Sequence, residues 1–262
     1  MIRALYTAAS GMSAQQLNLD TIANNLANSA TAGFRKRRLE FHDMIYQNLV
    51  TPGAAQSQQT IAAGLQVGLG AKSSATEIIQ TQGDLKQTGN QLDVAIQGAG
   101  FFTVIRPDGT NAYTRDGSFH LNNQGGLVSA DGDLVNPQIT IPPNATSVSI
   151  TQYGVVNVTL PGQAIAQQVG QIQLATFANP GGLESIGGNL MTETLASGNA
   201  ITGNPGGTEG LGTLQQGYVE GSNVDVVEEF VQMILAQRAY ESNSKVAKAA
   251  DDMYEQINNI PR

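Results

Sequence analysis

Residues 4–28 read ALYTAASGMSAQQLNLDTIANNLAN, and this stretch decides the fold. Large apolar residues recur in it every seven positions, a spacing typical of a helix that buries one face. The members of this track are Leu5, Met12, Leu19 and Leu26, with Ala8 and Ile22 widening it. The pattern predicts a helix of about 25 residues, roughly 37 Å long, which exceeds the usual length of a helix in a globular protein.

The face of this helix opposite the apolar track is almost uncharged. Between Arg3 and Arg35 the only charged residue is Asp20, and the remaining polar positions are Gln, Asn, Ser and Thr. Helices exposed to water usually carry Lys and Glu on that face. Amide and hydroxyl side chains avoid like-charge repulsion and offer hydrogen bonds, so this face favours packing against identical copies of the chain.

The C-terminal stretch, which opens at Ser222, predicts a second long helix that can reach Asn259. Ser222 or Asn223 can cap its start, and acidic residues follow near the positive end of the helix dipole. Two heptad tracks run along it. The first holds Val226, Met233, Tyr240, Ala247 and Tyr254, the second holds Ala239, Val246 and Met253, and Ala250 and Ile257 lie between them. The Glu241–Lys245 pair indicates a solvated side.

The middle of the chain predicts β-structure. Eight of the nine prolines lie between Pro52 and Pro205, and only two of the 30 glycines precede Gly53. Both residue types break helices and favour turns, and short alternating apolar runs lie between these turns. We expect eight to ten strands in an antiparallel barrel or sandwich.

The segment from Gln47 to Ser74 is rich in Gln, Gly, Ala and Thr, a composition typical of segments that are extended or disordered alone and can order against neighbours. The sequence therefore predicts an α+β fold in four segments. They are the N-terminal helix of a discontinuous helical domain at 1–40, a connector with an extended Gln/Gly-rich insertion at 41–74, a β-rich domain at 75–221, and the C-terminal helix at 222–262.

Composition excludes several classes of protein. The net charge is −8 at pH 7, which opposes binding to nucleic acid or to anionic membranes. Cysteine is absent, so disulfides and thiolate metal sites are excluded. The sequence holds no run of about 18 apolar residues, so we expect no membrane span, and the first ten residues lack the apolar core of a cleaved signal peptide.

The sequence holds no pattern that predicts catalysis, a cofactor or a metal. The two histidines, His42 and His120, have no second ligand at a metal-binding spacing. Hairpin turns explain the Asp-Gly pairs that begin at Asp108, Asp116 and Asp131 better than calcium binding does. We therefore expect a protein that is not an enzyme and has no catalytic, cofactor-binding or metal-binding residue.

One basic run, Arg35-Lys36-Arg37-Arg38, follows the N-terminal helix. An acidic chain does not supply the basic surround that a nucleic-acid site needs. We expect this run to be a solvated connector, or to contact an acidic patch on a neighbouring copy of the chain.

The two apolar tracks lie at opposite ends of the chain, and an isolated helix is marginal in water unless its apolar face is buried. Pairing the helices as an antiparallel coiled coil buries both tracks. An ordinary intramolecular hairpin is the alternative, but the uncharged face of the first helix favours polymerisation. The residues expected to carry assembly are Leu5, Met12, Leu19, Ile22, Leu26, Val226, Met233, Tyr240, Val246, Met253 and Ile257.

Three groups of residues are similar to the signatures of bacterial flagellar rod and hook proteins. The N-terminal group comprises 10–12 (SGM), 22–28 (IANNLAN) and 31–35 (TAGFR). The C-terminal group comprises 222–225 (SNVD), 229–230 (EF) and 237–241 (QRAYE). The internal group comprises 93–96 (DVAI), 98–102 (GAGFF) and 113–119 (YTRDGSF). Because these groups cover essentially the whole chain in order, the chain is identified as a member of the flagellar basal-body rod protein family.

The resemblance implies a structural subunit that polymerises into a hollow helical rod and transmits torque from the flagellar motor to the hook. Within the family, the β-rich section is most similar in size to that of distal rod subunits; another rod subunit or a hook-type axial protein is the alternative. The implied partners are further copies of the chain, proximal rod subunits, the hook protein, the rod-capping protein and the P and L ring proteins. The resemblance also implies export by the flagellar type III apparatus and a rod that crosses the periplasm.

A secreted carbohydrate-binding β-protein is a competing class of function. Such a protein needs an array of aromatic side chains on its surface. Aromatic residues make up only 5% of this chain and tryptophan is absent, which disfavours that class.

Overall fold

The computed structural model describes residues 2–50, 55–56, 59–60, 64–162, 165–207 and 210–258. Internal contacts divide the chain into two compact units. The helical unit comprises Met1–Ala27, Arg37–Ile78 and Asp225–Arg262, and the β-rich unit comprises Asn28–Lys36 and Ile79–Val224. Each unit is therefore built from segments that are far apart in the sequence. The four-segment division expected from the sequence stays a prediction.

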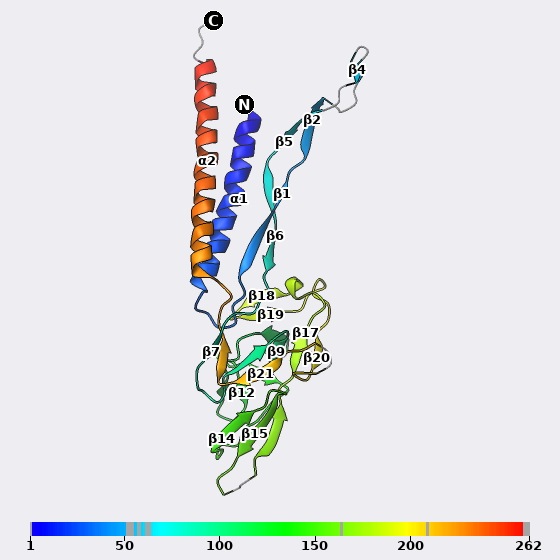
Figure 1. The fold of residues 1–262 in the computed structure, drawn as a ribbon, viewed down its shortest axis with the longest axis vertical. Helices are drawn as coiled ribbons and strands as arrows, with labels where there is room; N and C mark the ends of the chain where they lie inside the picture. Colours follow the sequence, from blue (N-terminus) through cyan, green and yellow to red (C-terminus); the bar gives the residue numbers. More distant parts are fainter. Residues whose placement is uncertain are drawn as a thin grey trace. The chain divides into compact units, whose positions relative to one another are not determined.

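Two long helices lie in the helical unit. Helix α1 spans Ile2–Ala27, and helix α2 spans Val226–Asn258. They lie side by side and run in opposite directions (Figure 1), so that Asn25 near the end of α1 contacts Glu229 near the start of α2. The two helices predicted at the ends of the chain are thus confirmed, whereas their pairing as a coiled coil stays a prediction.

An aspartate caps the start of α2. The Oδ1 atom of Asp225 accepts hydrogen bonds from the backbone N–H groups of Val227 at 2.8 Å and Glu228 at 3.2 Å. These bonds satisfy two of the donors that a helix start leaves open. The expected cap at Ser222 or Asn223 is wrong, because the Asn223 side chain bonds backbone groups of the β-rich unit instead.

Three antiparallel strand pairs complete the helical unit. Strand β1 (Arg37–Asp43) pairs with β6 (Ala71–Ile78), β2 (Tyr46–Val50) with β5 (Leu65–Gly68), and β3 (Ala55–Gln56) with β4 (Gln59–Thr60). Both β1 and β6 also contact α1. Residues 51–54, 57–58 and 61–63 of the expected insertion lie outside the described residues, and the Gln/Gly-rich insertion stays a prediction.

The β-rich unit is built on a nine-stranded antiparallel sheet. Most of its strands follow the order β11 (His120–Leu121), β12 (Leu127–Val128), β13 (Leu134–Asn136), β9 (Phe101–Ile105), β10 (Asn111–Thr114), β19 (Leu190–Thr192) and β18 (Glu184–Gly187). Strand β17 (Leu174–Thr176) joins through β9, and β20 (Ile201–Gly203) pairs with β17. The prediction of a central antiparallel β-rich domain is confirmed. The barrel alternative is wrong, because the described strands end on β11 and β18 without closing.

Smaller sheets surround this one. Strands β14 (Ser147–Ile150), β15 (Val155–Thr159) and β16 (Gln167–Gln171) form a sheet, β8 (Val94–Gln97) pairs with β21 (Thr213–Gln216), β7 (Leu85–Gln87) pairs with β22 (Tyr218–Glu220), and a 3-10 helix η1 spans Pro180–Gly182. The described part of the β-rich unit holds more strands than the expected eight to ten, because many of them are only two to four residues long.

The core of the β-rich unit lies on both faces of β9. Phe102 is fully buried in the larger cluster, where its ring meets that of Phe119 edge to face at 5.0 Å. Phe101 packs with Tyr113 and Phe177 in a second cluster. Adjacent residues of a strand point to opposite faces, so a strand that is apolar at successive positions is covered on both sides.

Candidate functional site

The helix pair is the candidate functional site, and its least exposed side chains are mostly small. They are Ala8, Ala14, Ile22 and Asn25 on α1, and Glu229, Ala236 and Ala250 on α2, and none is more than 6% exposed. A buried alanine removes much less apolar surface from water than a buried leucine does. The contact within one copy of the chain therefore contributes little hydrophobic stabilisation for helices of this length.

A glycine permits close approach of the two helices near the middle of α1. A Cβ atom placed on Gly11 would lie 2.8 Å from the Nδ2 atom of Asn243 on α2, which is closer than such atoms normally come. The Asn243 side chain thus covers the bare backbone of Gly11. Any side chain at position 11 would displace Asn243 or separate the helices.

Asn25 connects three elements of the helical unit. Its Nδ2 atom donates hydrogen bonds to the carbonyl of Arg37 at 2.8 Å and to the Oε2 atom of Glu229 at 3.1 Å, and its Oδ1 atom accepts one from the N–H of Arg37 at 2.9 Å. Asn25 is itself 2% exposed. Because a buried amide is costly unless its hydrogen bonds are made, this arrangement fixes α1 against both α2 and β1.

The expected assembly residues occupy three kinds of position in the isolated chain. Ile22 is buried, and Leu5, Met12, Leu19, Leu26 and Met233 are half-buried. Val226, Tyr240, Val246 and Met253 are exposed, and the side chain of Ile257 lies outside the described residues. The structure of one chain tests none of them as an assembly contact, so their role stays a prediction.

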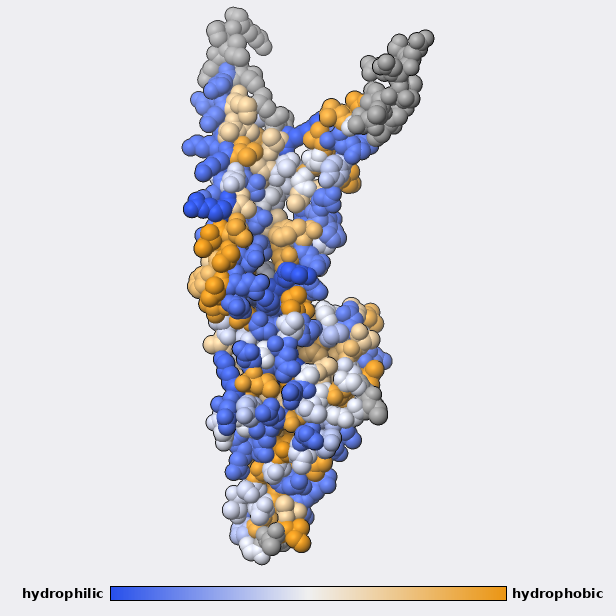
Figure 2. All heavy atoms as spheres, viewed as in Figure 1, coloured by the Kyte–Doolittle hydropathy of each residue, from blue (hydrophilic) through white to orange (hydrophobic). Residues whose placement is uncertain are grey.

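Five large apolar side chains form an exposed patch at the start of α2, which we call the apolar stripe: Val227, Phe230, Val231, Ile234 and Leu235. Their exposed fractions range from 48% for Phe230 to 73% for Val227. Figure 2 shows hydrophobic residues gathered over these first turns of α2. The residues of the apolar stripe recur at steps of three and four positions, and this spacing was visible in the sequence. The two predicted heptad tracks, which begin at Val226 and Ala239, use other positions and therefore did not include the stripe.

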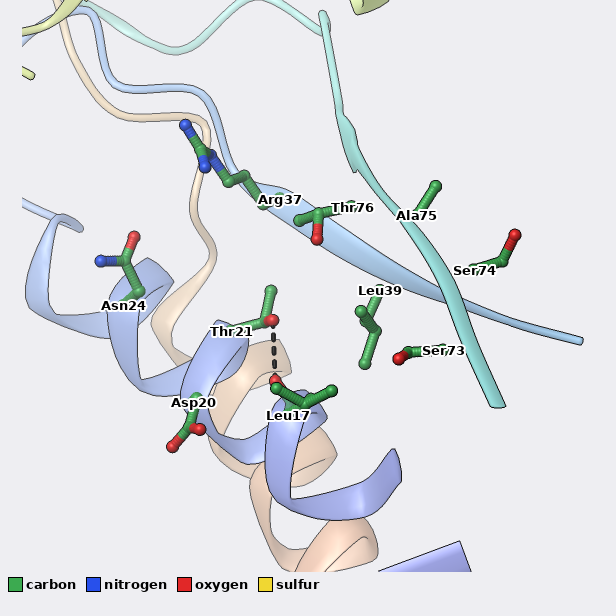
Figure 3. Close-up of a pocket in the computed structure, with 10 residues that line it drawn as sticks. All are labelled: Leu17, Asp20, Thr21, Asn24, Arg37, Leu39, Ser73, Ser74, Ala75 and Thr76. Atoms are coloured by element: carbon green, nitrogen blue, oxygen red, sulfur yellow. Dashed lines mark hydrogen bonds between the residues drawn. The ribbon is translucent and has the colours of Figure 1, made fainter. Parts of the chain in front are cut away.

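A groove of about 380 Å³ lies between α1 and the β1–β6 pair. Figure 3 shows Leu17 and Thr21 of α1 on one side, facing Leu39 of β1, which points toward Leu17. The hydroxyl of Thr21 donates to the carbonyl of Leu17 at 2.9 Å. The complete lining is Leu17, Asp20, Thr21, Asn24, Arg37, Leu39, Ser73, Ser74, Ala75 and Thr76.

The chemistry of this groove is that of a contact surface. Its lining has one carboxylate, Asp20, and one guanidinium, Arg37, among small hydroxyl and apolar side chains. Neither histidine lines it, and both His42 and His120 are exposed. Within the described ranges, no three His, Asp or Glu side chains come close enough to hold a metal ion.

Three family descriptions match successive parts of the chain. "Flagella basal body rod protein" matches residues 5–35, "Flagellar hook protein FlgE/F/G D1 domain" matches 95–158, and "Flagellar basal body rod FlgEFG protein C-terminal" matches 215–260. The first and last of these regions contain most of α1 and α2. The middle region contains the strands β9 and β10 at the core of the β-rich unit.

Full-length relatives decide the family. The chain is 51% identical to the flagellar basal-body rod protein FlgG of Caulobacter vibrioides over 96% of this chain and 97% of that one. It is 48% identical to FlgG of Borreliella burgdorferi over 100% of both chains. It is 47% identical to FlgG of Buchnera aphidicola subsp. Schizaphis graminum over 99% of this chain and 100% of that one. The chain belongs to the flagellar basal-body rod protein family.

This rod protein is a structural subunit of the flagellar basal-body rod. The prediction made from the three groups of signature residues is confirmed, including its similarity to distal rod proteins. The helices of the described part of the chain include none that is long and apolar enough to cross a membrane.

Proposed function

We propose that copies of this rod protein polymerise into the hollow helical distal rod, which transmits torque from the motor to the hook. The observation that carries polymerisation is the apolar stripe of α2. Monomeric soluble proteins rarely leave a contiguous group of large apolar side chains open to water. In the proposed rod, helices of neighbouring copies cover the stripe.

Burial of the apolar stripe is large enough to drive association. Full burial of one large apolar side chain stabilises by about 1.5–3 kcal/mol, so covering the remaining half of five side chains contributes roughly 4–7 kcal/mol. Association costs several kcal/mol in lost freedom of motion, so one contact gives weak binding and many contacts along a polymer give a stable rod. Val246 and Met253, both about half exposed, extend the apolar surface along α2.

We propose that α1 and α2 pair as an antiparallel coiled coil in the inner part of this rod. On α2, the buried and half-buried positions include Glu229, Met233, Ala236, Asn243, Ala247, Ala250 and Tyr254. Their steps of three, four and seven residues support a heptad seam that faces α1. Leu5, Met12, Leu19, Leu26 and Val226 then contact other elements or other copies around that seam.

The family supports the remaining parts of the proposal. The proposed partners are neighbouring copies, proximal rod subunits, the hook protein, the rod-capping protein and the P and L ring proteins. We place the rod across the periplasm and its subunits in the export path of the flagellar type III apparatus. The role is structural, with no catalysis and no cofactor, and the four sequence segments supply inner helices, connector and outer β-rich domain.

Ile234→Asp in the apolar stripe tests the proposal. The change places a carboxylate in the middle of the stripe, so we expect a folded monomer with unchanged helicity that forms no rods, as measured by circular dichroism, sedimentation and electron microscopy. Ser244→Asp is the matched control, because it adds the same charge at an exposed position of α2 outside the stripe. Rods of normal length and yield from Ile234→Asp would show that the stripe is not an assembly surface.

A further inference from the structure

Residues from three distant parts of the chain meet at one buried carboxylate in the β-rich unit. Glu220, in β22, is 0% exposed. Its Oε1 atom lies 2.8 Å from the Nη2 atom of Arg35, and its Oε2 atom lies 3.0 Å from the Nε atom of Arg115. Both arginines are at least 95% buried. The expectation that residues 35–38 form a solvated run is therefore wrong at Arg35.

This cluster carries an excess positive charge. Burial lowers the pKa of Arg115 to about 10 and also lowers the pKa of Arg35, while the Glu220 carboxylate opposes both shifts. An arginine whose pKa is about 10 keeps its proton at neutral pH. Two guanidinium groups thus share one carboxylate, and an unbalanced buried charge is strongly destabilising.

Backbone carbonyl dipoles partly stabilise the excess positive charge. Arg115 donates to the carbonyls of Gly100 at 2.6 Å and Gly98 at 2.8 Å, and Arg35 donates to the carbonyl of Thr81. Gly98 and Gly100 have φ values of +109° and +127°, which residues with a side chain rarely adopt. The loop at 98–100 therefore needs glycine at these two positions to aim its carbonyls at Arg115.

The same cluster holds the segment that follows α1. Residues 28–36, called the connector from here on, precede the 41–74 segment predicted from the sequence and belong to the β-rich unit. The N–H of Gly33 donates to the backbone carbonyl of Glu220 at 2.8 Å, and a Cβ atom at Gly33 would lie 2.6 Å from the backbone nitrogen of Asp116. Arg35 then bonds the carboxylate of Glu220 itself. Both the backbone and the side chain of Glu220 thus contact the connector.

We propose that Glu220 is a clasp, a buried carboxylate whose ion pair with Arg35 fastens the connector to the rest of the β-rich unit. Arg115 is a positioning residue that holds the Glu220 carboxylate in place. Arg115 forms an ion pair with Glu220 and donates hydrogen bonds to the 98–100 loop, whereas Arg35 lies on the connector. The clasp holds the connector, which follows α1 in the chain, against β22, which precedes α2. If the clasp is broken, we expect the connector to be released while the core around β9 stays folded.

The number of unpaired buried charges in each variant gives a test that separates the effect of charge from the effect of packing. Glu220→Gln keeps the side-chain shape but leaves two buried cations, whereas Arg35→Met keeps the apolar stem and leaves one neutral pair, Arg115 with Glu220. We expect Glu220→Gln to lower the urea midpoint of the monomeric full-length chain more than Arg35→Met does. Adding Arg35→Met to Glu220→Gln should then raise the midpoint again, because it removes one of the two unpaired cations.

Hydrogen exchange of the same monomeric variants locates the effect. In Arg35→Met we expect the amides of the connector to exchange at least about tenfold faster, while those of β9 exchange at the wild-type rate. Glu77→Gln is the control, because it breaks an exposed pair with Arg38, 2.7 Å apart, and should change neither rate. Unchanged exchange in the connector of Arg35→Met, or a double variant less stable than Glu220→Gln, would overturn the proposal.

Discussion

The two units of this rod protein bury different kinds of side chain. In the β-rich unit, large residues such as Phe102, Phe119 and Ile172 are almost completely buried. In the helical unit, Ala236 and Ala250 are buried while Phe230 and Ile234 are about half exposed. Large buried side chains stabilise a unit from within, whereas large exposed ones stabilise only when another surface covers them. The β-rich unit thus buries its largest side chains within one chain, whereas the start of α2 leaves large ones exposed.

The largest expected effect tests the internal stability of the β-rich unit. Phe102→Ala removes a 0% exposed ring that packs against Phe119, so we expect a loss of about 3–5 kcal/mol in the free energy of unfolding. Urea unfolding followed by circular dichroism measures it. Leu195→Ala is the control, because Leu195 is fully exposed and should change stability by less than about 0.5 kcal/mol. Equal effects of the two substitutions would show that burial of Phe102 does not stabilise the β-rich unit.

A smaller effect is expected when the polar contact within the helical unit is removed. Asn25→Ala leaves Glu229 and the backbone groups of Arg37 without their partner, at a cost of about 1–3 kcal/mol. Hydrogen exchange should show loss of protection in α1 with no change in β9. Asn18→Ala is the control, because the Asn18 amide makes only a long bond of 3.4 Å to Gln15. Full protection of α1 in Asn25→Ala would contradict this role.

The smallest effect appears only at alkaline pH and tests the environment of Tyr113 in the β-rich unit. Burial, together with the carboxylate of Glu193, raises the pKa of Tyr113 to about 12, compared with about 10 in an unfolded chain. The folded state therefore holds this proton more tightly, and its contribution to stability is complete below about pH 10 and is lost as the pH rises toward 12. Urea midpoints measured between about pH 9 and 11 should fall more steeply for wild type than for Tyr113→Phe. Equal slopes would show that the Tyr113 pKa is not raised.

Sequence pattern was sufficient for the helices. The observed bounds of α1, Ile2–Ala27, lie within two residues of the predicted range 4–28, because a long heptad track leaves little freedom for a helix. The central β-rich character also followed from the distribution of glycine and proline. The strands themselves did not, because a strand of two or three residues, such as β12 (Leu127–Val128), is defined by its partners rather than by its own pattern.

The contacts that position the helices were not visible in the sequence. Alanines such as Ala14 and Ala236 look alike on every face of a helix, so pattern analysis follows the larger apolar residues instead. The apolar stripe, which includes Phe230 and Ile234, had a clear spacing, but the heptad tracks that begin at Val226 and Ala239 were followed instead. The sequence did not indicate that Arg35 and Arg115 pair with Glu220, because each partner lies in a different part of the chain and only the fold brings them together.

The order of the segments along the chain has a consequence for the time at which the helix pair can form. Helix α1 is synthesised first, but α2 follows only after the whole β-rich unit. The β-rich unit can begin to fold around its own core while α1 still lacks Glu229 and Asn243 as partners. Until synthesis has passed residue 258, the chain therefore cannot form the complete helix pair.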